Sequence, residues 1–305
     1  MATSDYLKET GLRYFLEVAR SGSISQASER LFVAASAISR QISALEEILE
    51  VQLFDRHARG MVLTAAGEVL ATYARSMALE ADRVVADIVA LQGMDRGKVS
   101  IACSEGFAAH FLPSVILEFQ QDYPGIVFNL VVLGPVGISD LVRNGEADIG
   151  LAISRIAQKE IRIEHSQPAP VLVIMRPGHA LAGKTSVTLA ELATFPLVLP
   201  TSDTSLRQTF DLACSRRGLI IEPKVASNSS ATLHGPVLEG GFASLAGEVS
   251  VRQFLANGRM VAVPIRDRGL EIRNIELQTL VGRNLPVVVQ TFLKFLKERL
   301  SGEDA

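Results

Sequence analysis

A stretch near the N-terminus places polar side chains at a spacing that suits contact with the edges of DNA bases. Ser36, Arg40 and Ser43 recur every three or four residues, so on a helix they share one face, with Glu47 continuing it and Ser39 at its edge. Short serine side chains let a helix approach the major groove closely, and an arginine can reach base edges there. The pattern predicts a DNA-reading helix, and an ordinary pair of packed helices is the alternative.

The opposite side of this helix must hold it in place. Ile38, Ile42, Leu45 and Leu49 follow one another at spacings of four, three and four, which is the apolar stripe of a helix packed on a core. A preceding helix is expected to open with a capping box over residues 23–26, in which two otherwise unpaired amides find acceptors. A still earlier amphipathic helix over residues 12–19 would cover this pair.

A β-hairpin is expected directly after the reading helix. Two short apolar runs, at residues 51–54 and 61–63, flank a turn at residues 57–60. Three helices followed by such a hairpin form a winged helix-turn-helix. Its wing would carry Arg56 and Arg59 towards the phosphate backbone or a minor groove, whereas a solvated turn is the simpler interpretation of these two arginines.

The next segment reads as one long helix. Thr64 can cap it, and Glu68 in its first turn would suit the helix dipole. Its apolar residues alternate at spacings of four and three, as in a heptad seam. The seam comprises Leu70, Ala74, Met77, Ala81, Val84, Ile88 and Leu91. Such a seam predicts pairing between two copies of the chain, with burial against its own chain as the alternative, and residues 93–97 are the expected linker.

Composition sets limits on the class of protein. The 305 residues carry a net charge of −3, and 48% are hydrophobic, which predicts a globular chain of two or three domains. Any DNA contact must therefore depend on a few well-placed charges rather than on a basic surface. The sequence shows no signal peptide and no apolar run long enough for a membrane span. Its two cysteines form no paired motif, so a cytoplasmic protein with no membrane partner is expected.

From Lys98 onward the pattern changes to short apolar strands that alternate with helices. This alternation predicts an α/β region with mainly parallel sheets and ligand crevices at the carboxyl ends of the strands. Its length favours two lobes with a cleft between them. Strands are expected at 99–103, 127–133, 147–153, 171–175, 197–199 and 224–226, and helices at 107–121, 136–144, 189–194, 205–217 and 287–300.

Other motifs that could carry chemistry are weaker. Residues 178–185 match the phosphate-binding pattern GxxxxGK[ST], but the following residues are poor helix formers, and Thr188 is a better helix cap. Cys103 could act as a nucleophile or redox sensor, and a small buried strand residue is the preferred interpretation. The five histidines show no metal-ligand spacing. We therefore expect no catalytic set, metal site or cofactor.

Several stretches together resemble LysR-type transcriptional regulators over almost the whole chain. The N-terminal block LRYFLEVARSGSISQASERL…AISRQISALEEILEVQLFDRHARGMVLTAAGE is similar nearly position for position. Downstream, FLPSVILEFQQDYPGI, LVRNGEADIGLAI, VLVIMRPGHALA and VLEGGFASLAGE resemble the family's effector-binding domain. The resemblance implies a winged helix-turn-helix, a dimerising linker helix and a two-lobed effector domain of the periplasmic-binding-protein type (type II). It also implies homodimers or homotetramers on double-stranded promoter DNA that respond to a small-molecule effector, with RNA polymerase as a possible further partner.

The expected domain limits follow from this resemblance. Residues 1–64 would form the DNA-binding domain, 65–92 the linker helix and 93–305 the effector domain. Within the last, one lobe would comprise about 97–165 and 268–300, and the other 166–267.

The family's DNA contacts carry over onto matching positions. Ser39, Arg40 and Gln41 match a common Ser-Arg-Gln, whereas Ala35 stands where many members have a Gln that could bond adenine. Glu50 replaces a Gly that usually ends this helix, so a left-handed backbone there would cost about 1 kcal/mol. The predicted DNA-binding residues are Ser23, Ser25, Ala35, Ser36, Ser39, Arg40, Gln41, Ser43, Arg56 and Arg59.

The family resemblance places the effector site at loops that, in this sequence, follow predicted strands. Helix N-termini in these loops could hold a carboxylate, although serines and threonines there could equally be helix caps. Gly106 and Pro135 stand where relatives often have hydroxyls, and Glu105 and Asp203 add negative charge, so a neutral or zwitterionic effector is as plausible as an anion. The predicted lining residues are Ser104, Glu105, Gly106, Phe107, Gly134, Pro135, Ser154, Thr201, Ser202 and Ser205.

Two classes of function remain after these observations. The favoured one is a ligand-responsive transcriptional regulator that is not an enzyme. The alternatives are an α/β enzyme whose N-terminal helices serve only for oligomerisation, and a redox-responsive regulator that uses Cys103. No nucleophile–base set, metal cluster or cofactor fingerprint supports the enzyme.

Overall fold

The computed structural model describes residues 10–57, 60–91, 96–154, 158–270 and 273–302. Residues 1–84 and 85–305 form two compact units. Among the described residues, no helix combines the length and the apolar character that crossing a bilayer requires.

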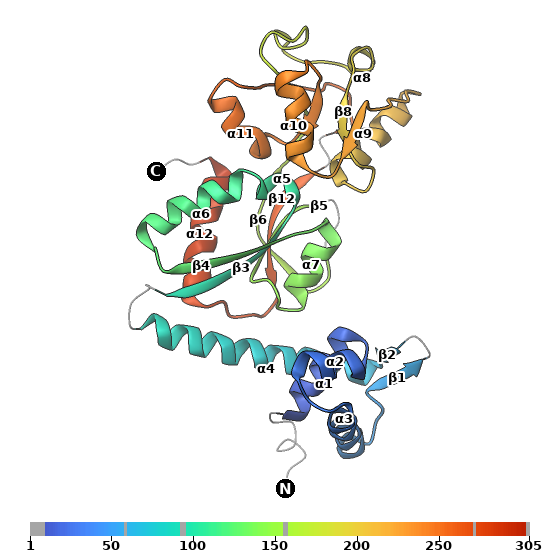
Figure 1. Ribbon diagram of the computed structural model, residues 1–305, viewed down its shortest axis with the longest axis vertical. Helices are drawn as coiled ribbons and strands as arrows, with labels where there is room; N and C mark the ends of the chain where they lie inside the picture. The colour runs from blue at the N-terminus through green and yellow to red at the C-terminus, as the bar shows by residue number, and fades with distance from the viewer. Residues whose placement is uncertain (1–9, 58–59, 92–95, 155–157, 271–272, 303–305) are drawn as a thin grey trace. The chain divides into compact units, whose positions relative to one another are not determined.

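The first unit is a winged helix-turn-helix followed by the start of a long helix (Figure 1). The apolar stripe of the reading helix is buried as predicted, because Ile38 and Ile42 are fully covered and pack with Phe15. Its elements are α1 (Thr10–Ser21), α2 (Ile24–Leu31), α3 (Ala35–Leu49), β1 (Phe54–His57), β2 (Gly60–Leu63) and α4 (Ala65–Ala90).

Two local expectations in this unit are wrong. The first strand of the wing begins at Phe54 rather than at residue 51, because the Glu46 carboxylate holds the amides of Leu53 and Phe54 in an irregular approach to the hairpin. Ser23 is the N-cap of α2, but its side chain makes no capping hydrogen bond. Instead the Ser21 hydroxyl donates to the Ser23 carbonyl and accepts from the Ser23 amide.

The junction between the wing and α4 is tightly packed. Thr64 caps α4 as predicted, since its hydroxyl accepts from the Gly67 amide at 3.1 Å. Gly67 is the third residue of this helix, and a Cβ added there would lie 2.1 Å from the Leu53 carbonyl oxygen. The same oxygen accepts from the Thr64 amide at 3.0 Å. Only glycine therefore fits at position 67 without moving the backbone.

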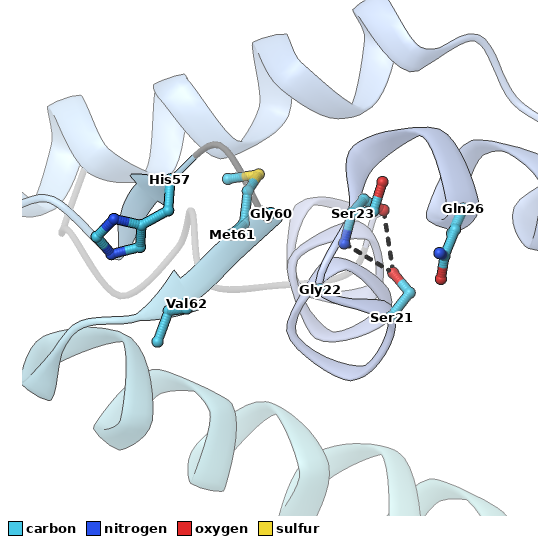
Figure 2. Close-up of a pocket in the computed structure, with 8 residues that line it drawn as sticks. All are labelled: Ser21, Gly22, Ser23, Gln26, His57, Gly60, Met61 and Val62. Atoms are coloured by element: carbon cyan, nitrogen blue, oxygen red, sulfur yellow. Dashed lines mark hydrogen bonds between the residues drawn. The ribbon is translucent and has the colours of Figure 1, made fainter.

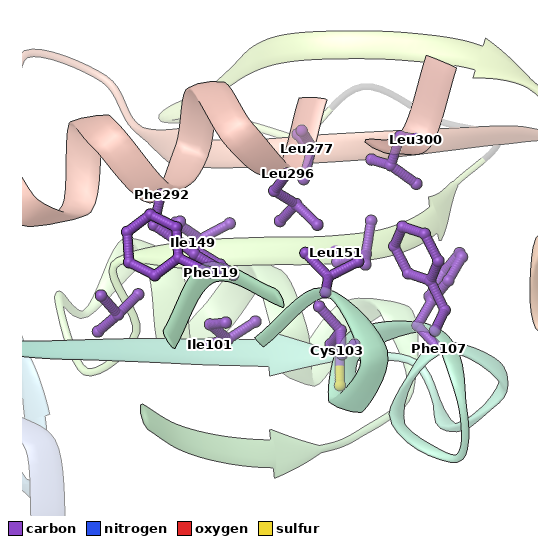
Figure 3. Close-up of a cluster of buried hydrophobic side chains, with 14 of the residues drawn as sticks. Ile101, Cys103, Phe107, Phe119, Ile149, Leu151, Leu277, Phe292, Leu296 and Leu300 are labelled. Carbon is purple, nitrogen blue, oxygen red and sulfur yellow. The ribbon is translucent and has the colours of Figure 1, made fainter. Parts of the chain in front are cut away.

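The described part of the second unit contains a five-stranded sheet, a three-stranded sheet and a separate pair of strands. The larger sheet has the order β4 (Ile126–Val132), β3 (Gly97–Cys103), β5 (Ile149–Ser154), β12 (Asn274–Leu280), β6 (Ile161–Pro168). Helices α5 (Glu105–Ala108), α6 (Phe111–Asp122), α7 (Pro135–Arg143) and α12 (Val287–Ser301) belong with it. Its core joins Ile101, Leu151 and Leu277 to Phe119 of α6 and Phe292 of α12 (Figure 3).

The second lobe is built on a smaller sheet of β10 (Ser244–Ala246), β7 (Leu172–Met175) and β11 (Val261–Pro264). Strands β8 (Val198–Pro200) and β9 (Val225–Ser227) pair beside it, with Leu197 bridging to Ala243. The helices of this lobe are α8 (Leu189–Leu192), α9 (Ser205–Arg216), α10 (Ser230–Glu239) and α11 (Glu248–Ala256).

The prediction of mainly parallel sheets is wrong. Strand β12 runs antiparallel to both of its neighbours, and β7 runs antiparallel to both of its own. These strands enter their sheets from distant parts of the chain, so they are not joined by the short β-α crossovers that enforce parallel pairing. The single helix expected over 107–121 is also two helices, α5 and α6, separated at residues 109–110.

The phosphate-loop interpretation of residues 178–185 is rejected by the local fold. A phosphate loop of this type requires a helix that begins at its Gly-Lys-Thr. Here the helix begins at Leu189, and Thr188 caps it in a reciprocal box with Glu191. The described residues also contain no group of three or more His, Cys, Asp or Glu side chains placed to hold a metal ion.

Candidate nucleic-acid interface and ligand cavity

The polar face of α3 is open to solvent. Ser36, Arg40, Ser43 and Glu47 are all exposed, and Ser39 is half-buried at the edge of this face. Ala35 and Gln41 are exposed as well. The face that the sequence assigns to DNA is thus available to a double helix within its own unit.

The wing is fixed to the turn between α1 and α2. The Met61 amide donates to the Gly22 carbonyl at 2.8 Å, and a Cβ at Gly60 would lie 2.6 Å from that same oxygen. Gly60 has a φ of +132°, so its backbone also favours glycine. A hollow of about 560 Å³ lies beside this contact (Figure 2). Its lining consists of Ser21, Gly22, Ser23, Gln26, His57, Gly60, Met61 and Val62.

Of the remaining predicted DNA contacts that the structure describes, only Ser23 lines this hollow. Ser23 borders it at the N-terminus of α2, where amide donors attract phosphate, and Ser25 is exposed in the first turn. Arg56 is exposed on β1, opposite Met61. Arg59 lies outside the described residues. The sequence analysis did not predict that Gly22 and Gly60 fix the wing to the turn between α1 and α2. The only sign of it in the sequence is a glycine in the turn of the predicted hairpin.

Glu50 ends α3 in a left-handed conformation, with φ +53° and ψ +32°. Its amide and that of Val51 donate back to the carbonyls of Glu46 and Glu47, which closes the last turn. The helix therefore ends in the conformation that a glycine would adopt there, and the glutamate side chain costs about 1 kcal/mol of stability.

A second cavity, of about 680 Å³, lies in the second unit and is lined from both lobes. This volume is within the range of about 300–1,000 Å³ that is usual for small-molecule sites. Seven predicted residues line it: Ser104, Glu105, Gly106, Phe107, Gly134, Pro135 and Ser205. The loops that follow β3, β4 and β8 thus converge, as the topology of the sequence suggested.

Three predicted residues lie outside the lining. Ser154 is buried at the end of β5 and pairs with β12, and Ser202 is exposed. Thr201 shapes the turn instead, because its carbonyl accepts from the amide and the hydroxyl of Thr204, which caps α9. The sequence reasoning missed several lining residues, including Ser227, Asn228, Ser229, Ser230, His234 and Arg273.

Five helix N-termini of the described residues border the cavity, those of α5, α7, α9, α10 and α11. Amide donors at such ends favour negative groups. The one at α10 is already occupied, because the Glu105 carboxylate accepts from the Ser230 amide at 2.7 Å and from the Ser230 hydroxyl. The other acidic side chains in the lining are Asp203, which is exposed, and Glu248, which pairs with Arg252.

Polar atoms of Ser104 and His234 in the cavity wall have no hydrogen-bond partner among the described residues. One is the Ser104 hydroxyl, in the first lobe, and the other is Nδ1 of His234, in the second. His234 is only 7% exposed and packs on the ring of Phe254. Burial lowers the pKa of His234, and His110 lowers it further while Glu105 partly opposes the change. His234 is therefore neutral at physiological pH.

Cys103 lies at the end of β3 and is fully buried in the core (Figure 3). Burial, together with the nearby charge of Glu105, raises the pKa of its thiol to about 11. A thiol with such a pKa carries almost no thiolate at neutral pH, which is the reactive form. The structure therefore agrees with a packing role for Cys103.

Comparisons with known proteins identify both units. The model for the lysR family of bacterial regulatory helix-turn-helix proteins matches residues 10–68. The model for the LysR substrate binding domain matches residues 92–301, which is more than half of the chain. The chain belongs to the LysR family of transcriptional regulators. It is a regulator and not an enzyme, with a helix-turn-helix for DNA and a substrate-binding domain for an effector.

Individual LysR-type relatives cover most of the chain. The RuBisCO operon transcriptional regulator of Allochromatium vinosum is 27% identical over 254 residues, which are 83% of this chain and 84% of the relative. YfeR, an uncharacterized HTH-type transcriptional regulator of Shigella flexneri, is 30% identical over 208 residues, 68% of each chain. Full-length OxyR from Pseudomonas aeruginosa has the same fold, with a TM-score of 0.64 at 18% identity and coverage of 98% and 94%.

Proposed function

We propose that this LysR-type regulator reads promoter DNA with the exposed face of α3 and contacts the phosphate backbone with the wing and the N-terminus of α2. The observation that carries this proposal is the exposure of Ser36, Arg40 and Ser43 on a helix whose other face is buried. Short side chains around one arginine suit a helix that lies deep in the major groove. Domain limits at 1–64, 65–92 and 93–305 belong to the same proposal.

Fluorescence anisotropy with duplex DNA from upstream of the protein's own gene tests this assignment. Arg40→Ala should weaken binding by about 1–3 kcal/mol and reduce the preference for this DNA over a scrambled duplex. Arg13→Ala is the matched control, because Arg13 is exposed on α1 and carries the same charge. It should leave the preference unchanged. Equal effects of the two variants on the preference would contradict the groove assignment.

We further propose that the chain acts as a dimer or a tetramer through α4. Beyond the buried Leu70 and Ala74, the predicted seam is exposed at Met77, Val84 and Ile88. A continuous apolar strip on a surface helix suits a second helix of the same kind. In the cytoplasm, two reading helices would then meet a two-fold site in promoter DNA, with RNA polymerase as an expected neighbour.

Sedimentation equilibrium tests the oligomer. Ile88→Glu should weaken self-association, because it places a charge in the seam. Ser76→Glu, at an exposed position of α4 that faces away from the seam, should not. A monomeric wild-type protein at micromolar concentration would contradict the proposal.

We also propose the cavity of about 680 Å³ as the effector site. A Cβ at Gly134 would meet no atom within 4 Å, and its φ of −73° suits any residue. Gly134→Phe should therefore fill the cavity without strain and abolish the stabilisation that metabolites give in a thermal-shift screen. Gly183→Phe, outside the lining and equally unobstructed, is the control. Metabolites that stabilise both variants equally would place the site elsewhere.

A further inference from the structure

The carboxylate of Glu105 spans the two lobes of the second unit. Glu105 is the first residue of α5, directly after β3 in the larger sheet, whereas Ser230 is the first residue of α10 in the other lobe. The carboxylate accepts from both the amide and the hydroxyl of Ser230, which lies 125 residues away in sequence. It replaces a local cap, because the N-cap residue Ser229 makes no side-chain capping hydrogen bond.

This contact places a negative group of the chain itself where an anionic ligand would otherwise bind. A helix N-terminus attracts carboxylates through its free amides and its dipole. A second carboxylate beside Glu105 would have to displace it or meet its charge at short range, and like charges that share a site repel each other.

Two further observations indicate what the cavity accepts at this end. His234, in the second turn of the same helix, is more than nine-tenths buried, lines the cavity, and has an Nδ1 atom without a partner among the described residues. The Ser104 hydroxyl, next to Glu105, is buried in the wall and likewise lacks a partner there. Buried polar atoms of this kind are normally satisfied by a hydrogen bond, which points to a polar group of a ligand.

We propose that Glu105 acts as an internal carboxylate ligand of α10, and that it excludes carboxylate effectors from this end of the cavity in favour of a hydrogen-bond donor. Hydroxyl, amide and ammonium groups share this chemistry, since each can donate to Glu105 or to an adjacent acceptor. The inference rests on the cavity being the effector site, and it names the chemical class that the site selects.

Acetate is the probe, tested by thermal shift on the full-length protein without DNA and compared with chloride at equal ionic strength. Glu105→Ala vacates the N-terminus of α10, so acetate should raise its melting temperature saturably, by about 3 °C at ten times the acetate Kd. The wild type should show no saturable shift. Asp203→Ala removes the same charge from an exposed position in the lining and should not respond either.

Ser230→Pro provides the second variant. Proline suits the first position of a helix, and Ser229 before it already has the extended backbone that proline requires, with φ −103° and ψ 123°. The substitution removes both donors to Glu105, so adding it to Glu105→Ala should abolish the acetate response. The two single variants should also be coupled, with the double variant losing less than the sum of their losses in melting temperature.

The proposal would be overturned by the absence of an acetate shift in Glu105→Ala, by a saturable shift in the wild type, or by additive losses in the double variant. An acetate response that persists in the double variant Glu105→Ala, Ser230→Pro would overturn it as well. These measurements use acetate alone, with neither DNA nor an effector, so a failure here is distinguishable from a failure of the metabolite screen on Gly134→Phe, which tests the effector site itself.

Discussion

Gly67→Ala should destabilise the DNA-binding unit, although the same change in most helices is stabilising. Alanine gains about 0.8–1.0 kcal/mol over glycine in a helix interior. At this position the new Cβ would lie 2.1 Å from the Leu53 carbonyl oxygen and 2.9 Å from Cδ2 of Leu63. The first distance has to grow to about 3.4 Å for ordinary contact, so the loop before the wing must move away from α4.

The cost has two parts. Overpacking of this kind typically costs about 1–3 kcal/mol. Moving Leu53 also strains its hydrogen bond from the Thr64 amide, which contributes about 0.5–1.5 kcal/mol. After subtraction of the gain in helix propensity, a net loss of about 0.5–3.5 kcal/mol remains. For a unit of this size, each kcal/mol lowers the melting temperature by about 4–8 °C.

Calorimetry on the full-length protein should therefore show an earlier transition of the DNA-binding unit, together with weaker DNA binding in the anisotropy assay. Gly137→Ala is the matched control. Gly137 is likewise the third residue of its helix, α7, and its Cβ would meet only the side chain of Leu133, at 3.3 Å. That change should be neutral or stabilising. Equal or higher stability of Gly67→Ala would refute the steric reasoning.

Three further predictions concern other buried or paired groups. Glu46→Leu leaves the amides of Leu53 and Phe54 unpaired, which should lower the free energy of unfolding in urea by about 1–3 kcal/mol for each amide. Glu46→Gln should cost much less, because its side-chain oxygen can still accept from these amides. The thiols of Cys103 and Cys214 are buried, and the pKa of each is raised to about 11, so both should resist iodoacetamide at about pH 8 until the protein is unfolded. Rapid labelling of Cys103 in the native protein would instead support the redox-responsive regulator. Hydrogen bonds from Lys184 and Thr188 lower the pKa of Glu191 to about 2, so its contribution to stability is present above its usual pKa of 4.5 and lost as the pH falls towards 2. Urea unfolding of Glu191→Gln should show a weaker pH dependence over that interval, and an unaltered profile would contradict this.

The elements that the sequence predicts well are those with a strong local pattern. The stripe of α3 has the helical period and a polar opposite face, so both its fold and its exposed serines follow from spacing alone. The left-handed conformation of Glu50 at the end of α3 could be predicted only from the family resemblance, because a glutamate by itself does not indicate a positive φ. The predicted capping box at Ser23 is not formed, and the Ser21 hydroxyl accepts from the Ser23 amide that the Gln26 side chain was expected to bond.

The ligand cavity was predicted only in part. Loops after β3, β4 and β8 were assigned from the family resemblance, and the convergence of strand ends in α/β folds supported them. Helix α10 was missed because Gly235 and Pro236 interrupt its helical pattern. With α10 missing, neither His234 nor the partner of Glu105 could be assigned. That pairing joins residues far apart in sequence and leaves no local signal in either segment.

Strand β12 is the last strand to be synthesised, although it lies inside the larger sheet. It fills the place between β5 and β6, yet residues 274–280 leave the ribosome only after every strand of the smaller sheet, which ends at Pro264. During translation the later lobe can therefore form first, while the earlier sheet ends at the open edge of β5 and β6 has no strand to pair with. Unpaired edges of this kind readily recruit other chains. A nascent chain stalled before residue 274 should for that reason be far more prone to aggregate than one stalled after residue 280.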